Sequence, residues 1–391
     1  MNWMKSNKMK NIESKLPQVG TTIFATMSAL AVKHDAINLA QGFPDFDGSD
    51  YLKERVSHYI NNGANQYAPM PGVPVLNQAI ADKIRLCYGT EVSASEEITV
   101  VSGATQGLFA AIHTVIRAGD EAIVFDPAYD SYDPAIELAG GKCVHIPLTE
   151  NVFAIDWEML ADSINERTRL IIINSPHNPT GATLSLADLE RLWQLIKDKD
   201  IYLISDEVYE HIIFDGLEHA SVHYHPLLAK RSFILSSFGK TYHMTGWKVG
   251  YCVAPVEMTA EFRKVHQFLV FSTSTPMQYG LADMINKHPE HATELPLFYQ
   301  QKRDVFRDAM ADTRFKLLNC SGTYFQLVDY SAISDLNDFD FCHWLTEEAG
   351  VVGIPISSFY QTPVEGQKII RFCFAKGTET LQRVGELLSK V

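Results

Sequence analysis

The sequence predicts an α/β fold in which a mostly parallel sheet lies between helices, followed by a smaller α+β region. Three observations favour this fold class. Short runs rich in Ile, Val and Leu alternate with helical patterns between about residues 50 and 290. These runs are almost continuously apolar, which is typical of strands buried on both faces. Beyond residue 290 the pattern changes to one long helical stretch and short strands.

The expected elements follow one another in a regular order along the chain. The apolar runs predict strands at 98–102, 122–125, 169–174, 201–205 and 232–237. The periodic runs between them predict helices at 104–119, 131–141 and 185–200. In the C-terminal region we expect a helix at 298–313 and strands at 322–330 and 368–375.

The change of pattern divides the chain into two expected domains. A chain of 391 residues is long enough for one large core and a smaller one. We expect a large domain at 46–290 and a small domain made of 1–45 and 291–391.

Composition argues against nucleic acid and membranes as partners. Acidic residues number 47 and basic residues 33, a formal net charge of −14, whereas both partners select basic surfaces. No apolar run approaches the ~18 residues of a membrane span, and the N-terminus lacks the apolar stretch of a signal peptide. The six cysteines are scattered without metal-type spacing, which favours free thiols, no metal site and a cytoplasmic location.

Polar residues gather just after the expected strands, where parallel sheets bind ligands. The first strand ends in Ser102-Gly103-Ala104-Thr105 at the start of a helix. Small residues there let backbone N–H groups reach an anion, although a plain helix cap explains the same letters. Asp206 ends the strand at 201–205 and must find a cation or a donor; a structural salt bridge or a cap is the alternative.

Two further strand ends carry candidate residues. Asn178 lies in the turn Asn-Pro-Thr-Gly after the strand at 169–174, so it serves either a ligand or the turn alone. Tyr129 follows the strand at 122–125, and core packing is the alternative for its ring.

Lys240 follows the strand at 232–237 among aromatic residues. Burial lowers the pKa of an ammonium and makes lysine a nucleophile or base, which suits Schiff-base chemistry. A phosphate-binding P-loop is excluded because Ile234 stands where its first glycine is required. Arg371 lies in an apolar strand and requires an anion, either a carboxylate ligand or one of the chain's own carboxylates.

In chain order, these motifs closely resemble those of the class I and II pyridoxal-phosphate aminotransferases of fold type I. SSFGKTYHMTGWKVGY, NSPHNPTG and SDEVYEH are specific to that family, and the resemblance runs from QGFPDFD to RFCFA. It implies a large domain with a sheet of the seven-stranded type. NLAQGFPDFDG and NQYAPMPGVP look like the branch of kynurenine aminotransferases, cysteine-conjugate β-lyases and bacterial methionine aminotransferases, and the methionine enzymes look nearest.

The resemblance implies roles around pyridoxal 5'-phosphate. Lys240 would be the catalytic residue and would form a covalent aldimine with the cofactor. Asp206 would pair with the pyridinium nitrogen, so that the ring acts as an electron sink. Asn178 and Tyr209 would hydrogen-bond the phenolic oxygen, and Tyr129 would stack on the ring.

The same resemblance implies a phosphate cradle. Gly103, Ala104 and Thr105 would hold the phosphate together with Ser237 and Lys248. Many relatives carry arginine where Lys248 stands, so the charge is kept here while the planar fork is lost.

The resemblance also implies how substrates bind. Arg371 would bind the α-carboxylate, assisted by Asn178 and the backbone of Gly42. Tyr67 would reach the site of the other subunit, which implies a homodimer with shared active sites. Phe24 and Tyr67 would supply an apolar wall for the side chain, although ordinary packing also explains Phe24.

The implied activity moves the α-amino group of methionine to a 2-oxo acid by a ping-pong mechanism. Phenylalanine, tyrosine or kynurenine are expected as further donors. A cysteine-conjugate β-lyase would use the same lysine and cofactor, so the motifs leave that alternative open. A non-catalytic ligand sensor is disfavoured, because the pattern begins by about residue 20 and the charge is acidic.

Overall fold

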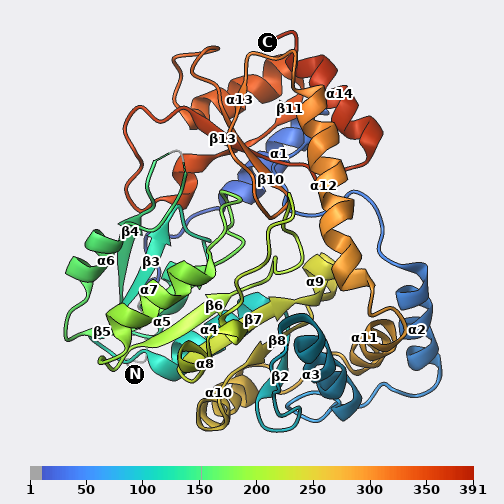
Figure 1. Cartoon of the computed structure of the whole chain (residues 1–391). Helices are drawn as coiled ribbons and strands as arrows, with labels where there is room; N and C mark the ends of the chain where they lie inside the picture. The colour runs from blue at the N-terminus through green and yellow to red at the C-terminus, as the bar shows by residue number, and fades with distance from the viewer. Residues whose placement is uncertain (1–10, 151) are drawn as a thin grey trace, which may run out of the picture.

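A computed structural model describes residues 11–150 and 152–391 of the chain. Its centre is a seven-stranded sheet with the order β2-β8-β7-β6-β5-β3-β4 (Figure 1). The strands are β2 Ile98–Val101, β3 Glu121–Asp126, β4 Lys142–Pro147, β5 Thr168–Asn174, β6 Tyr202–Asp206, β7 Ser232–Ser237 and β8 Gly250–Val253. Strand β8 runs antiparallel to both of its neighbours, β2 and β7. The other neighbouring strands pair in parallel. The predicted mostly parallel sheet is confirmed.

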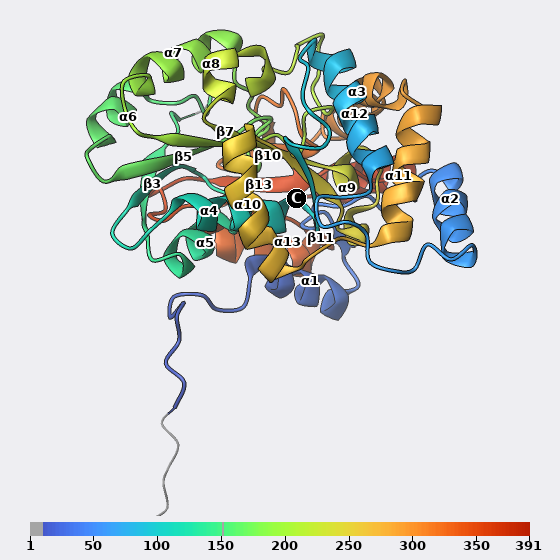
Figure 2. The ribbon, with the colours of Figure 1, turned by 90° about the horizontal axis from the view of Figure 1, so that it is seen from below.

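Helices cover both faces of this sheet (Figure 2). One face carries α4 Ala104–Val115, α5 Tyr132–Leu138 and α10 Val256–Leu269, and the other carries α6 Trp157–Ser163, α7 Leu186–Ile196 and α8 Pro226–Ala229. Successive strand residues point to opposite faces. Leu170 and Ile172 therefore join the core beneath α4, while Ile171 and Ile173 join the larger core on the other side. Burial on both faces explains the continuous apolar runs.

Two strands of the sheet lie outside the runs expected from the sequence. The edge strand β4 has exposed residues at both ends, three half-buried residues and a buried Ile146, so its composition is less apolar than that of a central strand. The antiparallel strand β8 has four residues and follows directly on the loop that contains Lys248. Short or edge strands leave a weak hydrophobic pattern.

The C-terminal part of the chain forms a second layer above the large sheet (Figure 1). Its antiparallel sheet has the order β12-β13-β10-β9. The elements are α12 His291–Ala309, β9 Lys316–Leu317, β10 Phe325–Asp329, α13 Asp338–Ala349, β11 Val351–Val352, β12 Ile354–Pro355, β13 Ile369–Cys373 and α14 Thr378–Leu388. The expected helix is α12, which begins earlier than its pattern indicated.

The N-terminal segment is joined to this second layer. Helix α1 Ile23–His34 leads into β1 Ile37–Asn38, which pairs in parallel with β11. These pairings support the division at 46 and 290, which stays a proposal. Residues 1–10 of the proposed small domain lie outside the described residues.

The remaining helices flank the large sheet. They are α2 Asp50–Asn61, α3 Pro74–Tyr88, α9 Phe238–Thr241 and α11 Thr275–Lys287. Within the described ranges, no helix combines the length and apolar character that a membrane crossing needs.

Candidate active site

The carboxyl ends of β5, β6 and β7 open into a cavity of about 180 Å³. Ten of the fourteen predicted site residues line it: Gly103, Ala104, Thr105, Tyr129, Asn178, Asp206, Tyr209, Ser237, Lys240 and Lys248. They come from six separate segments of the chain. The parallel sheet brings these segments together, because the carboxyl ends of its strands meet along one edge.

One side of the cavity is built to receive an anion. Helix α4 begins after Gly103, and no side chain among the described residues caps this end. Ser102, the alternative cap, instead shares a hydrogen bond of 2.8 Å with the Thr273 hydroxyl. A Cβ atom at Gly103 would lie 3.2 Å from the Lys248 Nζ atom. Free N–H groups, the helix dipole and an ammonium therefore converge there.

Lys248 reaches this position through an unusual backbone conformation. Its φ of 54° lies in the left-handed region, which non-glycine residues rarely adopt. Gly103 also has a positive φ, of 78°. These two loop conformations bring the ammonium of Lys248 beside the start of α4.

At the opposite side of the cavity, Asp206 is a buried carboxylate without an ion-pair partner among the described residues. The Tyr132 hydroxyl donates to its Oδ2 atom at 2.7 Å. Burial raises the pKa of the Asp206 carboxyl from 3.8 to about 6. The salt-bridge alternative is therefore absent, whereas a cap-like contact is present, because the Val208 backbone N–H donates to Asp206 Oδ1 at 3.4 Å. A cationic donor in the cavity would still find a carboxylate without an ion-pair partner among the described residues.

Lys240 lies between aromatic rings, as its sequence setting predicted. Its Nζ atom donates to the Tyr324 hydroxyl at 2.7 Å and to the Gly42 carbonyl at 3.3 Å. The same atom lies 5.4 Å from the centre of the Tyr209 ring. Desolvation lowers the pKa of the Lys240 ammonium from 10.5 to about 8. A substantial fraction of the amine is therefore neutral near pH 8 and able to act as nucleophile or base.

Arg371 is 1% exposed and takes part in no ion pair among the described residues. Its Nη1 atom donates to Asn178 Oδ1 at 2.8 Å and its Nη2 atom to the Ala40 carbonyl at 3.1 Å. The Nε atom is buried without a partner in the described chain. The alternative of an internal carboxylate partner is therefore absent, and Asn178 serves more than its turn. Desolvation lowers the pKa of Arg371 to about 10, so the residue stays charged at pH 7.

Tyr129 lies three residues after Asp126, whose carboxylate is fixed by two hydrogen bonds. The Asp126 carboxylate accepts from His145 Nδ1 at 2.7 Å and from the Gln361 backbone N–H at 2.9 Å. Hydrogen bonds to two carboxylates raise the pKa of His145 to about 9, against its desolvation. The Tyr129 hydroxyl lies 3.2 Å from Thr105 Oγ1, and this contact links the loop of Tyr129 to the start of α4.

Four predicted residues do not line this cavity. The guanidinium carbon of Arg371 lies 5.5 Å from the centre of the Phe24 ring. Gly42 contacts Lys240 through its carbonyl, whereas Ala40 supplies the backbone contact to Arg371. Tyr67 is 86% exposed and packs edge-on against Phe271, so within this chain it contributes nothing to the cavity.

Three residues that the sequence reasoning did not select also belong to the site. Asn174 lines the cavity and donates to the Asp206 carbonyl at 2.8 Å. It ends β5, so the same strand-end rule could have found it. Tyr132 and Tyr324 hold Asp206 and Lys240, but nothing in their local sequence marks them.

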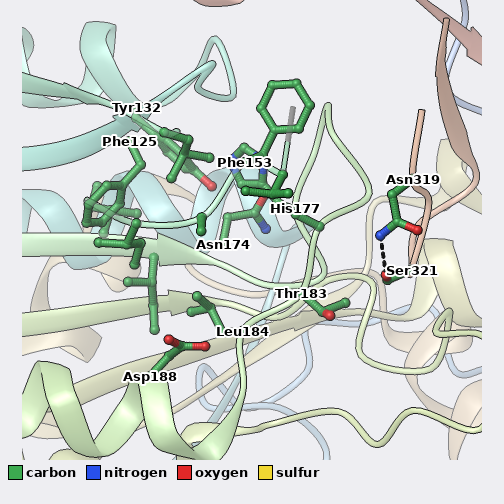
Figure 3. A pocket seen from close by; sticks show the side chains of 17 residues that line it. Phe125, Tyr132, Phe153, Asn174, His177, Thr183, Leu184, Asp188, Asn319 and Ser321 are labelled. Carbon is green, nitrogen blue, oxygen red and sulfur yellow. Dashed lines mark hydrogen bonds between the residues drawn. The ribbon is translucent and has the colours of Figure 1, made fainter. Parts of the chain in front are cut away.

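A second cavity of about 150 Å³ also has Asn174 among its lining residues (Figure 3). Phe125 and Tyr132 lie on one side of it, and Asn319 and Ser321 on the other. No lysine, arginine or cysteine is among its lining residues. We therefore assign the chemistry to the first cavity.

The donor set of the first cavity fits pyridoxal 5'-phosphate, the cofactor implied by the sequence resemblance. The uncapped start of α4 and the Lys248 ammonium match a phosphate. The unpaired Asp206 carboxylate matches a protonated ring nitrogen, and the Lys240 amine matches an aldehyde. Arg371 keeps a free N–H for a substrate anion.

Comparisons with known proteins agree with this geometry. Residues 34–387 match the family model described as aminotransferase class I and II. The chain is 55% identical to the methionine aminotransferase of Escherichia coli K12, over 97% of this chain and 98% of that protein. It is 33% identical to the kynurenine–oxoglutarate transaminase of Dictyostelium discoideum, over 95% and 94% of the two chains. The crystal structure of Escherichia coli YbdL, for which a methionine aminotransferase function is reported, superimposes with a TM-score of 0.96 over 98% of this chain and 100% of that one.

Replacing Asp206 with Asn is expected to stabilise the cofactor-free protein at pH 8. The folded carboxyl has the higher pKa, so wild-type stability falls as pH rises from about 4 through about 6. A shift of this size corresponds to roughly 3 kcal/mol of unfolding free energy above pH 7. Denaturant unfolding of the two proteins at pH 8 and at pH 4 measures the difference, which should vanish at the lower pH.

Asp198→Asn is the matched control for this experiment. Asp198 is exposed, so its substitution should change the unfolding free energy by less than about 0.5 kcal/mol. An Asp206→Asn protein that is no more stable than wild type at pH 8 would contradict the interpretation of Asp206 as an unpaired buried charge.

Proposed function

We propose that this chain, which belongs to the class I and II aminotransferases, transfers the α-amino group of methionine to a 2-oxo acid. Members of this family use pyridoxal 5'-phosphate, and the chain is an aminotransferase by its family. The observation that carries the proposal is a depressed-pKa lysine and an unpaired carboxylate in one cavity, together with an arginine from β13 that has no ion-pair partner among the described residues and is hydrogen-bonded to Asn178 of the cavity wall. The 55% identity to a methionine aminotransferase supports the choice of donor.

The proposed cofactor contacts follow from the cavity wall. The first residues of α4, with Ser237 and Lys248, would hold the phosphate. Asp206 would pair with the ring nitrogen, and Tyr129 would cover one face of the ring. Lys240 would attach the aldehyde through Nζ. When bound, the cofactor supplies an electron sink that stabilises negative charge at the substrate Cα atom.

The phenolic side of the cofactor would face two further residues of the wall. Asn178 and Tyr209 both line the cavity. The Asn178 Oδ1 atom already accepts from Arg371, which leaves its amide N–H₂ group free to donate to the cofactor oxygen. One amide thereby orients both the cofactor and the arginine.

Proton transfer is the proposed task of Lys240. A buried amine whose pKa is about 8 loses its proton readily at neutral to mildly alkaline pH. General acid–base catalysis is most efficient when the pKa of the catalytic group lies near the operating pH. The Lys240 Nζ atom would take the proton from the substrate Cα atom and deliver it to the C4′ atom of the cofactor, acting first as a base and then as an acid.

Substrate binding is assigned to Arg371. Its guanidinium has the planar fork of N–H groups that a carboxylate accepts bidentately, and no carboxylate of the described residues forms an ion pair with it. The donor amino acid and the acceptor 2-oxo acid both carry such a carboxylate, so both would occupy this place in turn, as a ping-pong mechanism requires. The Phe24, Phe325 and Phe359 rings around the guanidinium give the pocket an apolar character, which suits methionine and aromatic side chains.

Methionine is expected to convert the yellow holoenzyme in a half-reaction without an acceptor. The purified enzyme is mixed with each amino acid while the cofactor absorbance is followed. Methionine should react fastest, and aromatic amino acids and kynurenine should follow. Aspartate should be slow, because among the described residues no arginine lines the cavity that could pair with its side-chain carboxylate. Lys240→Ala should abolish the reaction and the borohydride-trapped link to cofactor, whereas Lys264→Ala at an exposed position should not.

Two results of that screen would overturn the proposal. A holoenzyme that reacts with aspartate far faster than with methionine would contradict the donor. Release of pyruvate and ammonia from a cysteine conjugate, without transamination of methionine, would indicate a β-lyase.

Arg371→Ala is expected to raise the KM for methionine by about 100-fold with little change in kcat, a loss typical of an unpaired buried charge. Arg371→Lys keeps the charge without the fork and should give an intermediate KM. Steady-state rates at saturating 2-oxo acid measure both. Arg383→Ala on the exposed surface of α14 is the control, and an unchanged KM in Arg371→Ala would refute the assignment.

We further propose a homodimer whose active sites are shared. Exposed aromatic residues gather at the end of α10: Phe268 is 88% exposed, Phe271 is 40% exposed, and Tyr67 at 86% packs beside Phe271. Such apolar exposure is typical of an interface. In this arrangement Tyr67 would complete the site of a second copy, next to its cofactor phosphate and substrate side chain.

Sedimentation is expected to report twice the chain mass of 43.9 kDa. Phe268→Asp should shift the mass toward one chain, because a carboxylate would be buried at the interface. Leu186→Asp, at an exposed leucine of α7, should leave the mass unchanged. A wild-type protein that sediments as a single chain at micromolar concentration would rule out the dimer.

A cytoplasmic location is proposed from the thiols. All six cysteines are free, which suits a reducing compartment. Fractionation of the source cells tests this, and recovery of the activity outside the cytoplasmic fraction would contradict it.

A further inference from the structure

We propose that Tyr324 is a positioning residue for Lys240, and that its hydroxyl holds the free lysine amine in hydrogen-bonding distance of the Gly42 carbonyl. This inference rests on the proposed function, because the lysine amine is freed in each turnover only if the enzyme exchanges its link to the cofactor for a link to the substrate. It concerns a residue that stands 84 positions from Lys240 in the sequence. It assigns to that residue the control of where the amine rests and how readily it binds a proton.

Three groups from distant parts of the chain meet at one point. The Lys240 Nζ atom lies 2.7 Å from the Tyr324 hydroxyl and 3.3 Å from the Gly42 carbonyl oxygen. The Tyr324 hydroxyl lies 2.6 Å from the same carbonyl oxygen. Among the described residues, these two oxygens are the hydrogen-bond partners of Nζ.

The direction of the hydrogen bonds is fixed by chemistry. A backbone carbonyl can only accept, so the Tyr324 O–H group donates to Gly42. The tyrosine oxygen then offers its lone pair to the Lys240 amine. Burial raises the pKa of the Tyr324 hydroxyl well above 10, so the phenol stays neutral and keeps this arrangement throughout the working pH range.

The hydroxyl itself has little freedom to move. Tyr324 is 0% exposed, and its carbonyl accepts from the Phe374 backbone N–H at 2.9 Å. Its ring packs edge-on against Tyr209 at 5.2 Å and lies 5.6 Å from Tyr299. A side chain confined in this way presents its hydroxyl at one place.

Gly42 is confined as well. A Cβ atom at this position would lie 2.9 Å from the Phe325 ring, so the residue must be glycine for the loop to approach so closely. The carbonyl is thereby brought to Lys240 and Tyr324 together. The loop thus supplies the second hydrogen-bond acceptor for the Lys240 amine.

Several charged or titratable groups face Lys240 besides Tyr324. Lys248 and Arg371 disfavour the ammonium, whereas Asp206 and Cys373 favour it. None of these four is a hydrogen-bond partner of Nζ among the described residues. Tyr324 is therefore the one side chain that can favour the ammonium through a direct hydrogen bond.

The hydrogen bonds of Lys240 to Tyr324 and Gly42 have two consequences for the reaction. A freed amine that donates to Tyr324 and Gly42 keeps its place beside the cavity, so it is in position for the next proton transfer. The same bond favours the protonated amine, which opposes desolvation and keeps the lysine from becoming permanently neutral. Removal of the hydroxyl alone should therefore alter both the pH dependence and the rate.

Tyr324→Phe tests the inference, because it removes one oxygen atom and keeps the ring. In the cofactor-free full chain, labelling of Lys240 by acetic anhydride is measured by mass spectrometry across pH. The wild-type midpoint is expected near the Lys240 pKa of about 8. In the variant it should fall by about one pH unit, the size expected for loss of a hydrogen bond to a charged group.

The holoenzyme supplies a second readout. In the methionine half-reaction, the maximal rate of Tyr324→Phe should fall about tenfold, with the apparent methionine affinity within about twofold, because the amine is misplaced rather than the substrate. Tyr299→Phe is the matched control: its hydroxyl bonds His243 at 2.9 Å, in the same aromatic cluster, and does not reach Lys240. It should leave the labelling midpoint and the rate at their wild-type values.

The two proposals fail in distinguishable ways. If no amino acid converts the holoenzyme, the proposed function falls, while the labelling midpoint still reports on the bond to Tyr324. If methionine reacts but Tyr324→Phe labels at the wild-type pH, the role of Tyr324 is refuted and the function stands. Equal shifts in Tyr324→Phe and Tyr299→Phe would refute it too, because they would indicate a general packing effect.

Discussion

Two charged side chains, Asp206 and Arg371, are buried beside the cavity without an oppositely charged partner within ion-pair distance in the described chain. Burying a charge without a partner costs several kcal/mol. Hydrogen bonds to neutral groups offset part of this free-energy cost. Tyr132 donates to Asp206, and Asn178 and Ala40 accept from Arg371. Both side chains are therefore held in place but lack an ion-pair partner in the described chain. Under the proposed function, a cationic group of the cofactor would pair with Asp206 and a substrate carboxylate with Arg371. The other features of the site depend on these two unpaired charges.

The sequence predicted the central sheet well because its strands are buried on both faces. Apolar runs such as RLIIIN and SFILSS are shorter than a typical helix, which favours buried strands. The edge strand β4 and the four-residue strand β8 lay outside the expected runs, because one is partly exposed and the other is too short to leave a pattern. Periodicity reports burial, so elements with mixed burial escape it.

The candidate site divides in the same physical way. Residues at strand ends, such as Asp206 and Lys240, could be predicted because charge after an apolar run is conspicuous. Tyr324 and Tyr132 could not, because a neutral hydroxyl becomes informative only when its partner is known. Gly42 was expected to assist substrate binding through its backbone, which stays a prediction. The contact of its carbonyl with Lys240 could not be predicted, because a motif does not specify which loop carbonyl meets the lysine. The roles inferred for these residues stay predictions.

Lys248 combines two properties that are usually found in different residues. It carries the ammonium nearest the start of α4, and it occupies a left-handed backbone conformation, which costs about 1 kcal/mol or more in a non-glycine residue. An anion that binds this ammonium therefore also secures the loop between α9 and β8. Binding of an anion there would therefore act on the Lys248 side chain and on the backbone of its loop together, so that the phosphate and the loop would be stabilised as one unit.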